Sequence, residues 1–81
     1  MKVRVRLFAI AKQTAGRETV EVELAEGATI AELRARLAAE VPGLAGLIGQ
    51  MLFAVGARYA PEETAVPPDA EVACIPPVSG G

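Results

Sequence analysis

The chain has 81 residues, a formal net charge of −2, one cysteine and no histidine, which bounds it to a single small globular domain. One cysteine excludes an internal disulfide and an all-cysteine metal site, and the absence of histidine removes the side chain most used as a general acid or base near neutral pH. Charges of both signs are interspersed and no apolar run approaches the roughly 20 residues that span a bilayer, so we expect no nucleic-acid partner, no membrane contact and a cytoplasmic location.

The first 24 residues of the chain predict two paired strands. Residues 2–7 alternate between polar and apolar types, the period of a half-buried strand, and Phe8 extends this strand on the other face. Residues 9–15 are alanine-rich and predict a short helix ended by Gly16. Residues 18–24 alternate again, so we expect a second strand that is antiparallel to the first.

The main helix is predicted from its start signal and its periodicity. Thr29 and Glu32 have the spacing of a capping box, in which the two side chains satisfy free backbone N–H groups at a helix start. The helix is expected from residue 30 to about residue 41, where Pro42-Gly43 follows. On another face, Glu32 and Arg36 have the spacing of an ion pair one helical turn apart. The apolar face of this helix comprises Ile30, Leu33, Leu37 and Val41.

The second half of the chain predicts further strands. Residues 44–50 are ambiguous and suggest a helical turn, while residues 51–55 read as a third strand with a possible return at residues 58–60. Residues 64–66 suggest a short edge segment. Residues 71–75 carry little charge after Glu71 and predict a last strand that is central and covered.

This order of elements favours an α+β domain of the β-grasp, or ubiquitin-like, class. It predicts a mixed sheet of about five strands with one main helix across one face, and the first and last strands paired in parallel at its centre. We assign residues 1–75 to this domain and residues 76–81 to an extended C-terminal tail.

The residue types of the tail are those expected of a segment that inserts into another protein. It consists of Pro76, Pro77, Val78, Ser79, Gly80 and Gly81. Prolines favour an extended path, and glycines lack a Cβ, so the tip is suited to threading a slot too narrow for other residues. Fully extended, the tail would reach about 20 Å. We therefore expect the carboxylate of Gly81 to be the reactive group.

Three segments carry a resemblance to a known family: Leu7-Phe8-Ala9 at the end of the first strand, Gly27-Ala28-Thr29-Ile30 at the helix entry, and Glu71-Val72-Ala73 before the tail. With them, the chain resembles the small subunits of molybdopterin synthase, which are ubiquitin-like sulfur carriers. It departs from that pattern at Cys74-Ile75, where many members have two aromatic residues, at Lys12-Gln13, and at Val55-Gly56-Ala57.

The resemblance implies a two-stage chemistry at Gly81. An adenylyltransferase of the ubiquitin-activating type would use ATP to adenylate the carboxylate, and a sulfur donor enzyme would supply the sulfur that converts it to a thiocarboxylate. The tail would then enter the large subunit, in a heterotetramer of two small and two large subunits, and donate sulfur to a cyclic pyranopterin phosphate to build the molybdopterin dithiolene. The small subunit itself would have no autonomous active site, no metal site and no permanently bound cofactor.

A carrier of this kind also needs a docking face. We expect Phe8 and Ile75, on neighbouring strands, to contact the large subunit with Lys12 as a polar contact at the rim, although both apolar residues would equally suit the edge of a core. Cys74, between Ala73 and Ile75, is expected to be a buried small hydrophobe and not a reactive thiol.

Several other functions fit the same pattern. One is a sulfur carrier for thiamine, tRNA thiolation or cysteine synthesis. Another is a protein modifier that joins Gly81 to lysines of its targets, and a third is an interaction module of the same fold. An autonomous enzyme is not predicted, because no catalytic constellation is visible in the sequence.

Overall fold

The computed structural model describes residues 1–77. Its elements are β1 (Lys2–Leu7), α1 (Ile10–Ala15), β2 (Thr19–Glu23), α2 (Ile30–Glu40), the 3₁₀ turns η1 (Pro42–Leu44) and η2 (Ile48–Gln50), β3 (Leu52–Val55), β4 (Arg58–Tyr59) and β5 (Glu71–Ile75).

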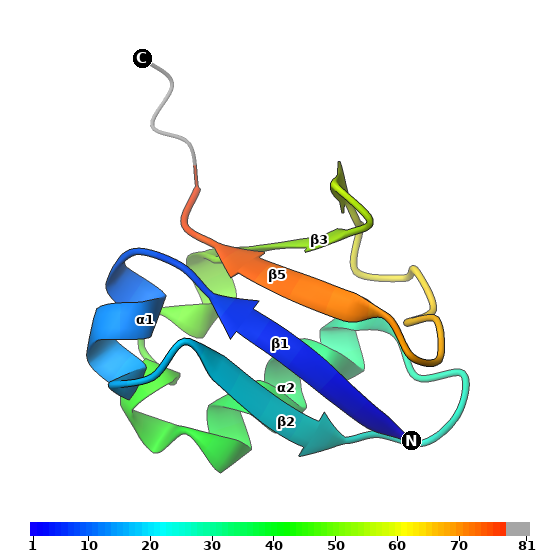
Figure 1. The fold of residues 1–81 in the computed structure, drawn as a ribbon, viewed down its shortest axis with the longest axis horizontal. Helices are drawn as coiled ribbons and strands as arrows, with labels where there is room; N and C mark the ends of the chain where they lie inside the picture. The colour runs from blue at the N-terminus through cyan, green and yellow to red at the C-terminus, as the bar shows by residue number, and fades with distance from the viewer. Residues whose placement is uncertain (78–81) are drawn as a thin grey trace.

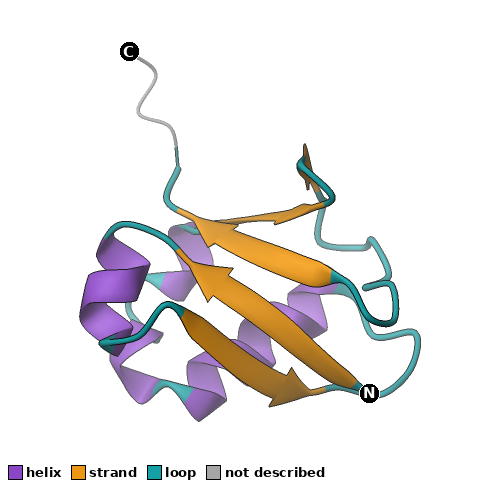
Figure 2. Ribbon diagram, viewed as in Figure 1, coloured by secondary structure: helices purple, strands orange, loops and turns teal. Residues whose placement is uncertain are grey.

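The five strands form one mixed sheet in the order β2-β1-β5-β3-β4. β1 and β5 pair in parallel at its centre, with Val5 opposite Val72 and Leu7 opposite Cys74, and the other pairs are antiparallel. In Figures 1 and 2, α2 lies behind the sheet and α1 lies beside one end of it, so one face of the sheet is covered and the other is open. The predicted β-grasp fold, the central position of the last strand and its parallel pairing with the first strand are all confirmed.

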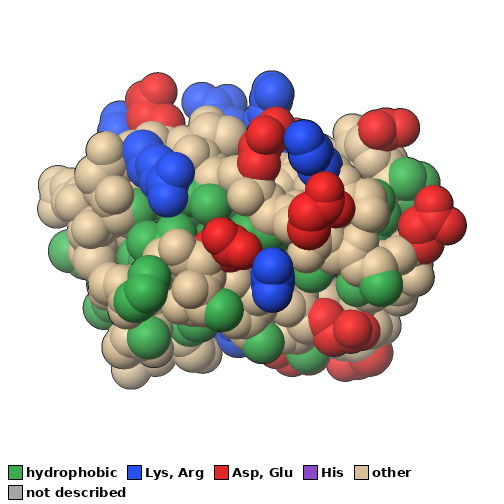
Figure 3. All heavy atoms as spheres, turned by 90° about the horizontal axis from the view of Figure 1, so that it is seen from below, with side chains coloured by type: hydrophobic (Ala, Val, Ile, Leu, Met, Phe, Trp, Pro, Cys, Tyr) green, Lys and Arg blue, Asp and Glu red, His purple; other side chains and the backbone are tan. Residues whose placement is uncertain are grey.

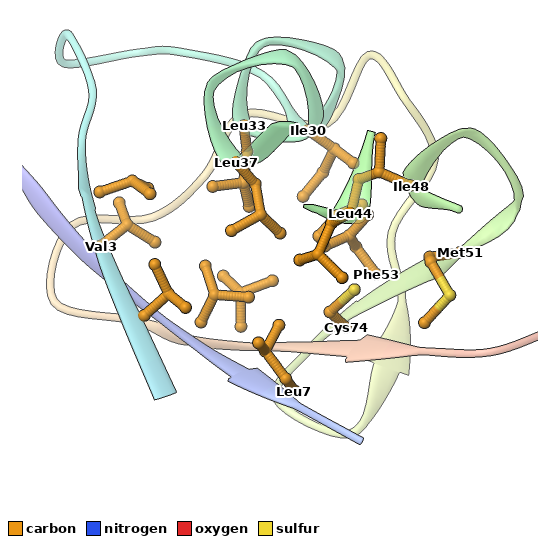
Figure 4. Packing of buried hydrophobic residues seen from close by; sticks show 14 of the residues in the cluster. Val3, Leu7, Ile30, Leu33, Leu37, Leu44, Ile48, Met51, Phe53 and Cys74 are labelled. Atoms are coloured by element: carbon orange, nitrogen blue, oxygen red, sulfur yellow. The ribbon is translucent and has the colours of Figure 1, made fainter. Parts of the chain in front are cut away.

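The core lies between the sheet and α2. Because successive strand residues point to opposite faces, β1 turns Val3, Val5 and Leu7 toward the helix and its charged residues toward solvent. Leu33 and Leu37 of α2 are fully buried against them (Figure 4). Each such leucine stabilises the fold by about 1.5–3 kcal/mol relative to an exposed one. No polar or charged residue among residues 1–77 is buried.

The start of α2 is capped as the sequence predicts. The Glu32 N–H donates to the Thr29 hydroxyl at 3.3 Å, and the Thr29 N–H donates to the Glu32 carboxylate at 3.1 Å. The segment after β4 completes the cap, because the Ile30 N–H donates to the Thr64 carbonyl at 2.9 Å. The helix start therefore holds this distant segment in place as well as itself.

Two local predictions differ from the structure. Glu32 does not pair with Arg36, because its carboxylate turns back onto Thr29; Arg36 pairs instead with Glu40 at 3.2 Å. Residues 64–66 form no strand and contribute only an isolated bridge between Ala65 and Thr29. The ambiguous residues 44–50 include the end of η1 and all of η2.

Arg34 joins α2 to the beginning of β3, a contact that the sequence did not predict. Its guanidinium donates to the carbonyl oxygens of Ile48 and Met51, the latter at 2.7 Å, and to the Glu62 carboxylate at 3.0 and 2.6 Å. It also lies 4.9 Å from the centre of the Phe53 ring. The hydrogen bond from Arg34 holds the pKa of the Glu62 carboxyl below its ordinary value. One half-buried side chain thus ties together three stretches of the chain, around residue 34, residues 48–53 and residue 62.

Candidate functional site

The chain leaves the sheet from the end of its central strand. Phe8, just beyond β1, donates its N–H to the Cys74 carbonyl at 3.2 Å, and Leu52 of β3 lies opposite Ile75 on the other side. The end of β5 is therefore held from both sides. Pro76, half-buried, and Pro77, exposed, follow it. The remaining predicted tail residues, numbers 78–81, lie outside the described residues, and the domain boundary after residue 75 stays a prediction.

Next to this exit, the open face of the sheet carries an apolar groove of about 830 Å³. We call it the sheet groove. It is lined by the apolar residues Phe8, Ala54, Tyr59, Ala73, Ile75 and Pro76. Arg6 and Glu71 also line it and form an ion pair at 3.9 Å. The arrangement is suited to receiving an apolar segment whose edge carries charge.

The hollow results from a contrast in side-chain size. Strand alternation places Ala73 on the open face, and the register sets Ala54 of β3 directly beside it. These two small residues lie between the large rings of Phe8, which is 39% exposed, and Tyr59, which is 60% exposed. Exposed aromatic rings around a floor of alanines form a surface that is complementary to a protruding side chain.

The structure brings together two of the three residues predicted for the docking face. Phe8 and Ile75 both line the sheet groove. Lys12 does not line it; its ammonium group donates to the Glu18 carboxylate at 3.0 Å, and this hydrogen bond holds the pKa of Glu18 below its ordinary value. The contacts of all three residues with a partner stay predictions. Tyr59 was not predicted, although an exposed tyrosine after a predicted turn was a usable signal.

Cys74 lies in the core, as predicted, with no exposed surface. Burial raises the pKa of its thiol to about 11, and the nearby charge of Arg34 opposes this only in part. The thiol is therefore protonated and poorly nucleophilic at neutral pH. Of the pair Cys74-Ile75, at which the chain departs from the family pattern, only Ile75 lines the groove.

The rest of the described surface offers few alternative sites. Among residues 1–77, no group of three or more histidine, cysteine, aspartate or glutamate side chains is placed to hold a metal ion. No helix in this part of the chain is long and apolar enough to cross a membrane. Seen from below, acidic and basic side chains mingle with apolar ones (Figure 3).

Known proteins resemble this chain over its full length. It is 34% identical over 83 residues to the molybdopterin synthase sulfur carrier subunit of Chlamydomonas reinhardtii, and the match covers 100% of both chains. The crystal structure of SAMP1 from Haloferax volcanii superposes with a TM-score of 0.86 at 27% identity, covering 100% of both chains. A complex of subunits 1 and 2 of the molybdopterin-converting factor from Helicobacter pylori includes a chain with a TM-score of 0.68 at 27% identity, again covering 100% of both. The ThiS family model matches residues 5–81, so the chain belongs to the ThiS family.

Proposed function

We propose that this chain is the sulfur carrier subunit of molybdopterin synthase and acts in molybdenum cofactor biosynthesis. The observation that carries the proposal is the full-length match to a molybdopterin synthase sulfur carrier subunit, together with a family match that runs through Gly80-Gly81. The fold supports the same role, because it sets the tail at the end of a central strand that is bonded on both sides.

The proposed chemistry takes place at the Gly81 carboxylate. A carboxylate is a poor electrophile, so an adenylyltransferase joins it to AMP from ATP and releases pyrophosphate. Sulfide-level sulfur (HS⁻) supplied by a donor enzyme then displaces AMP, which leaves with one carboxylate oxygen, and a thiocarboxylate remains. The thiocarboxylate sulfur attacks a carbon of the cyclic pyranopterin phosphate and displaces an oxygen substituent from that carbon. Water then cleaves the carbonyl–sulfur bond of the resulting thioester, which leaves the sulfur on the pterin and restores the Gly81 carboxylate. Enclosure of the tail by each partner enzyme keeps water from the activated group until that step.

The tail residues have distinct parts in this proposal. Pro76 and Pro77 direct the tail away from the sheet, and Val78 and Ser79 span the entrance of the partner's active site. Gly80 must pass the narrowest part of the channel. The protein holds no permanent cofactor in this scheme, because ATP belongs to the activating enzyme and sulfur travels as the thiocarboxylate.

We propose the sheet groove as the docking surface for the large subunit. The chain of the Helicobacter pylori complex that resembles this one is bound to a second subunit, which supports a partner of this kind. The groove adjoins Pro76, so a protein seated there is positioned to take the tail into its own active site. Two small and two large subunits would form the complete enzyme.

Ile75→Glu tests this docking surface, because it puts a charge into the groove. It should weaken binding to the large subunit by about tenfold or more. Ile10→Glu is the matched control, because Ile10 is an exposed isoleucine that does not line the groove, and it should bind as the unaltered chain does. Lys12→Ala measures the predicted rim contact separately. Equal binding by the two isoleucine variants would exclude the groove as the docking surface.

Two changes in the tail test the chemistry. Deleting Gly81 should abolish sulfur transfer, because it removes the carboxylate proposed to carry the sulfur, and it should leave the melting temperature nearly unchanged. Gly80→Val should fold normally and fail in adenylation or transfer, because a side chain blocks the channel. Normal turnover by either variant in a reconstituted assay would contradict the carrier mechanism.

The similarity to SAMP1, a small archaeal modifier protein, favours a second candidate function. In that case Gly81 would be joined to lysine side chains of other proteins by an amide bond. The two functions differ in the product isolated from cells: a free chain with a thiocarboxylate in the first case, and conjugates that survive thiol reagents in the second. Sulfur carriers for thiamine, tRNA thiolation or cysteine synthesis would give the same thiocarboxylate and are separated by the partner that co-purifies.

A further inference from the structure

The sheet groove is open to solvent in a single chain, with Phe8 and Tyr59 exposed at its sides. Contiguous apolar surface of this kind on a small domain favours association with another surface. We infer that a second copy of this chain covers the groove, in a two-fold symmetric dimer whose open sheet faces pack against each other. This inference goes beyond the proposed function and does not depend on it.

The charges of the groove are complementary to themselves. Arg6 and Glu71 both line it and are each about half exposed, with side-chain exposures of 52% and 51%. In a two-fold dimer every contact occurs twice, so Arg6 can pair with Glu71 of the partner subunit while Glu71 pairs with the partner subunit's Arg6. Because one charge of each sign lines the groove, each of these two charges can pair with the opposite charge of a second copy.

The strand register places large residues opposite small ones under the same symmetry. Ala73 lies at the middle of the groove, between Arg6 on β1 and Ala54 on β3. On β5, Glu71 precedes it and Ile75 follows it on the same face. A two-fold axis that runs diagonally across the face through Ala73 exchanges the positions of Arg6 and Glu71. The same axis exchanges Ile75 with Ala54, so each isoleucine meets the partner subunit's small alanine.

The outer part of the groove follows the same rule. The diagonal axis sets the Phe8 ring over the partner's turn at Gly56-Ala57, which also lines the groove and presents little side-chain bulk. The strands of the two sheets then cross at close to a right angle, one of the two usual geometries of packed sheets. Arg4 lies near the axis and keeps Glu21 of its own chain as counter-ion, at 3.9 Å.

Charge reversal at the rim tests the dimer directly. Arg6→Glu leaves two negative charges at the rim, and Glu71→Arg leaves two positive charges, so each variant alone should dimerise about tenfold or more weakly. A one-to-one mixture of the two variants restores both pairs across the interface. Sedimentation velocity of the full chain, from micromolar to millimolar concentration, should therefore show weak dimers of each variant alone and dimers of ordinary strength in the mixture.

The matched control is the surface pair Arg36 and Glu40 on α2, on the opposite side of the sheet. Arg36→Glu and Glu40→Arg should leave dimerisation unchanged. The doubly reversed chain, Arg6→Glu with Glu71→Arg, keeps an opposite-charge pair within one chain and should dimerise as the unaltered chain does, which guards against loss of folding in a single variant. A chain that stays monomeric at millimolar concentration, or a mixture no stronger than its components, would overturn the inference and leave the groove to a different protein.

A dimer of this kind has a consequence for the tail. Pro76 lines the groove, so a second copy seated there occupies the surface that we propose for the large subunit. Adding the large subunit should then convert dimers of this chain into the mixed complex. The mass of the Gly81 adduct does not depend on this equilibrium, so failure of the dimer leaves the sulfur-carrier proposal untouched.

Discussion

Replacing Arg34 by methionine removes the guanidinium that ties α2 to the start of β3 and keeps most of the apolar stem. The Arg34 side chain is only 19% exposed and donates to two backbone carbonyls, those of Ile48 and Met51, as well as to the Glu62 carboxylate. Because β3 begins directly after Met51 and lies beside the end of β5, the same tie fixes one side of the strand from which the tail departs.

The expected loss follows from these contacts. Hydrogen bonds to charged groups contribute about 1.5–3 kcal/mol each, and water can replace part of that for half-buried carbonyls. The contact with the Phe53 ring, 4.9 Å away, adds about 0.5–1 kcal/mol. The exposed part of the Glu62 pair contributes little. We expect Arg34→Met to lower the free energy of unfolding by about 2–3 kcal/mol, which lowers the melting temperature by roughly 10–20 °C.

Urea unfolding followed by circular dichroism measures this change. The control is Arg36→Met, the same substitution on the same helix, where an exposed ion pair with Glu40 contributes only about 0.3–0.5 kcal/mol. If the two variants lost equal stability, Arg34 would not be a tie between segments, and the account of how β3 is held would be wrong.

Three further predictions concern stability and reactivity. Ala57 has a φ of 66°, a conformation that is unfavourable for residues with a Cβ, so Ala57→Gly should raise the free energy of unfolding by about 1 kcal/mol. Ala35→Gly, on the exposed face of α2, should lower it by a similar amount. A loss of stability in both variants would contradict this reasoning. Cys74→Ala should lower the free energy of unfolding by about 1 kcal/mol and leave sulfur transfer unchanged. The Cys74 thiol of the unaltered chain should react slowly with Ellman's reagent until the protein unfolds. Loss of sulfur transfer in a folded Cys74→Ala variant would show that the thiol has a function. Folding lowers the pKa of Glu62 from its ordinary value of 4.5, so the stability that this carboxylate contributes is present above pH 4.5 and is lost as the pH falls through the folded pKa. Glu62→Gln should therefore weaken the dependence of stability on pH in the acid range. An unchanged pH dependence would count against the Arg34–Glu62 pair.

The features that follow local rules could be predicted from the sequence. Alternation in residues 2–7 and the spacing of Thr29 and Glu32 depend on neighbours along the chain, and the structure has both the strand and the capping box. The parallel pairing of the first and last strands followed from the order of elements. Phe8 and Ile75 were predicted as neighbours because that pairing places them at the same end of the sheet.

The features that depend on distant partners could not be predicted. Arg34 bonds with residues 14 to 28 positions away, and no spacing rule connects them. The pairing of Arg36 with Glu40 was missed because the Glu32 carboxylate can either accept from the Thr29 N–H or pair with Arg36. The hydrogen bond to the backbone is more favourable than an exposed ion pair, so Glu32 caps the helix and Arg36 pairs with Glu40. The hollow of the sheet groove required the register that sets Ala54 beside Ala73, which the sequence alone did not fix.

The mass of the intact protein, purified from its own cells without thiol-reactive reagents, tests the central claim most directly. The account predicts a fraction of the chain that is heavier by the exchange of one oxygen for sulfur, with fragmentation placing the change at Gly81 and the large subunit of the synthase co-purifying. A chain that carries only an ordinary carboxylate, even when its activating enzyme and a sulfur donor are supplied with ATP, would contradict it.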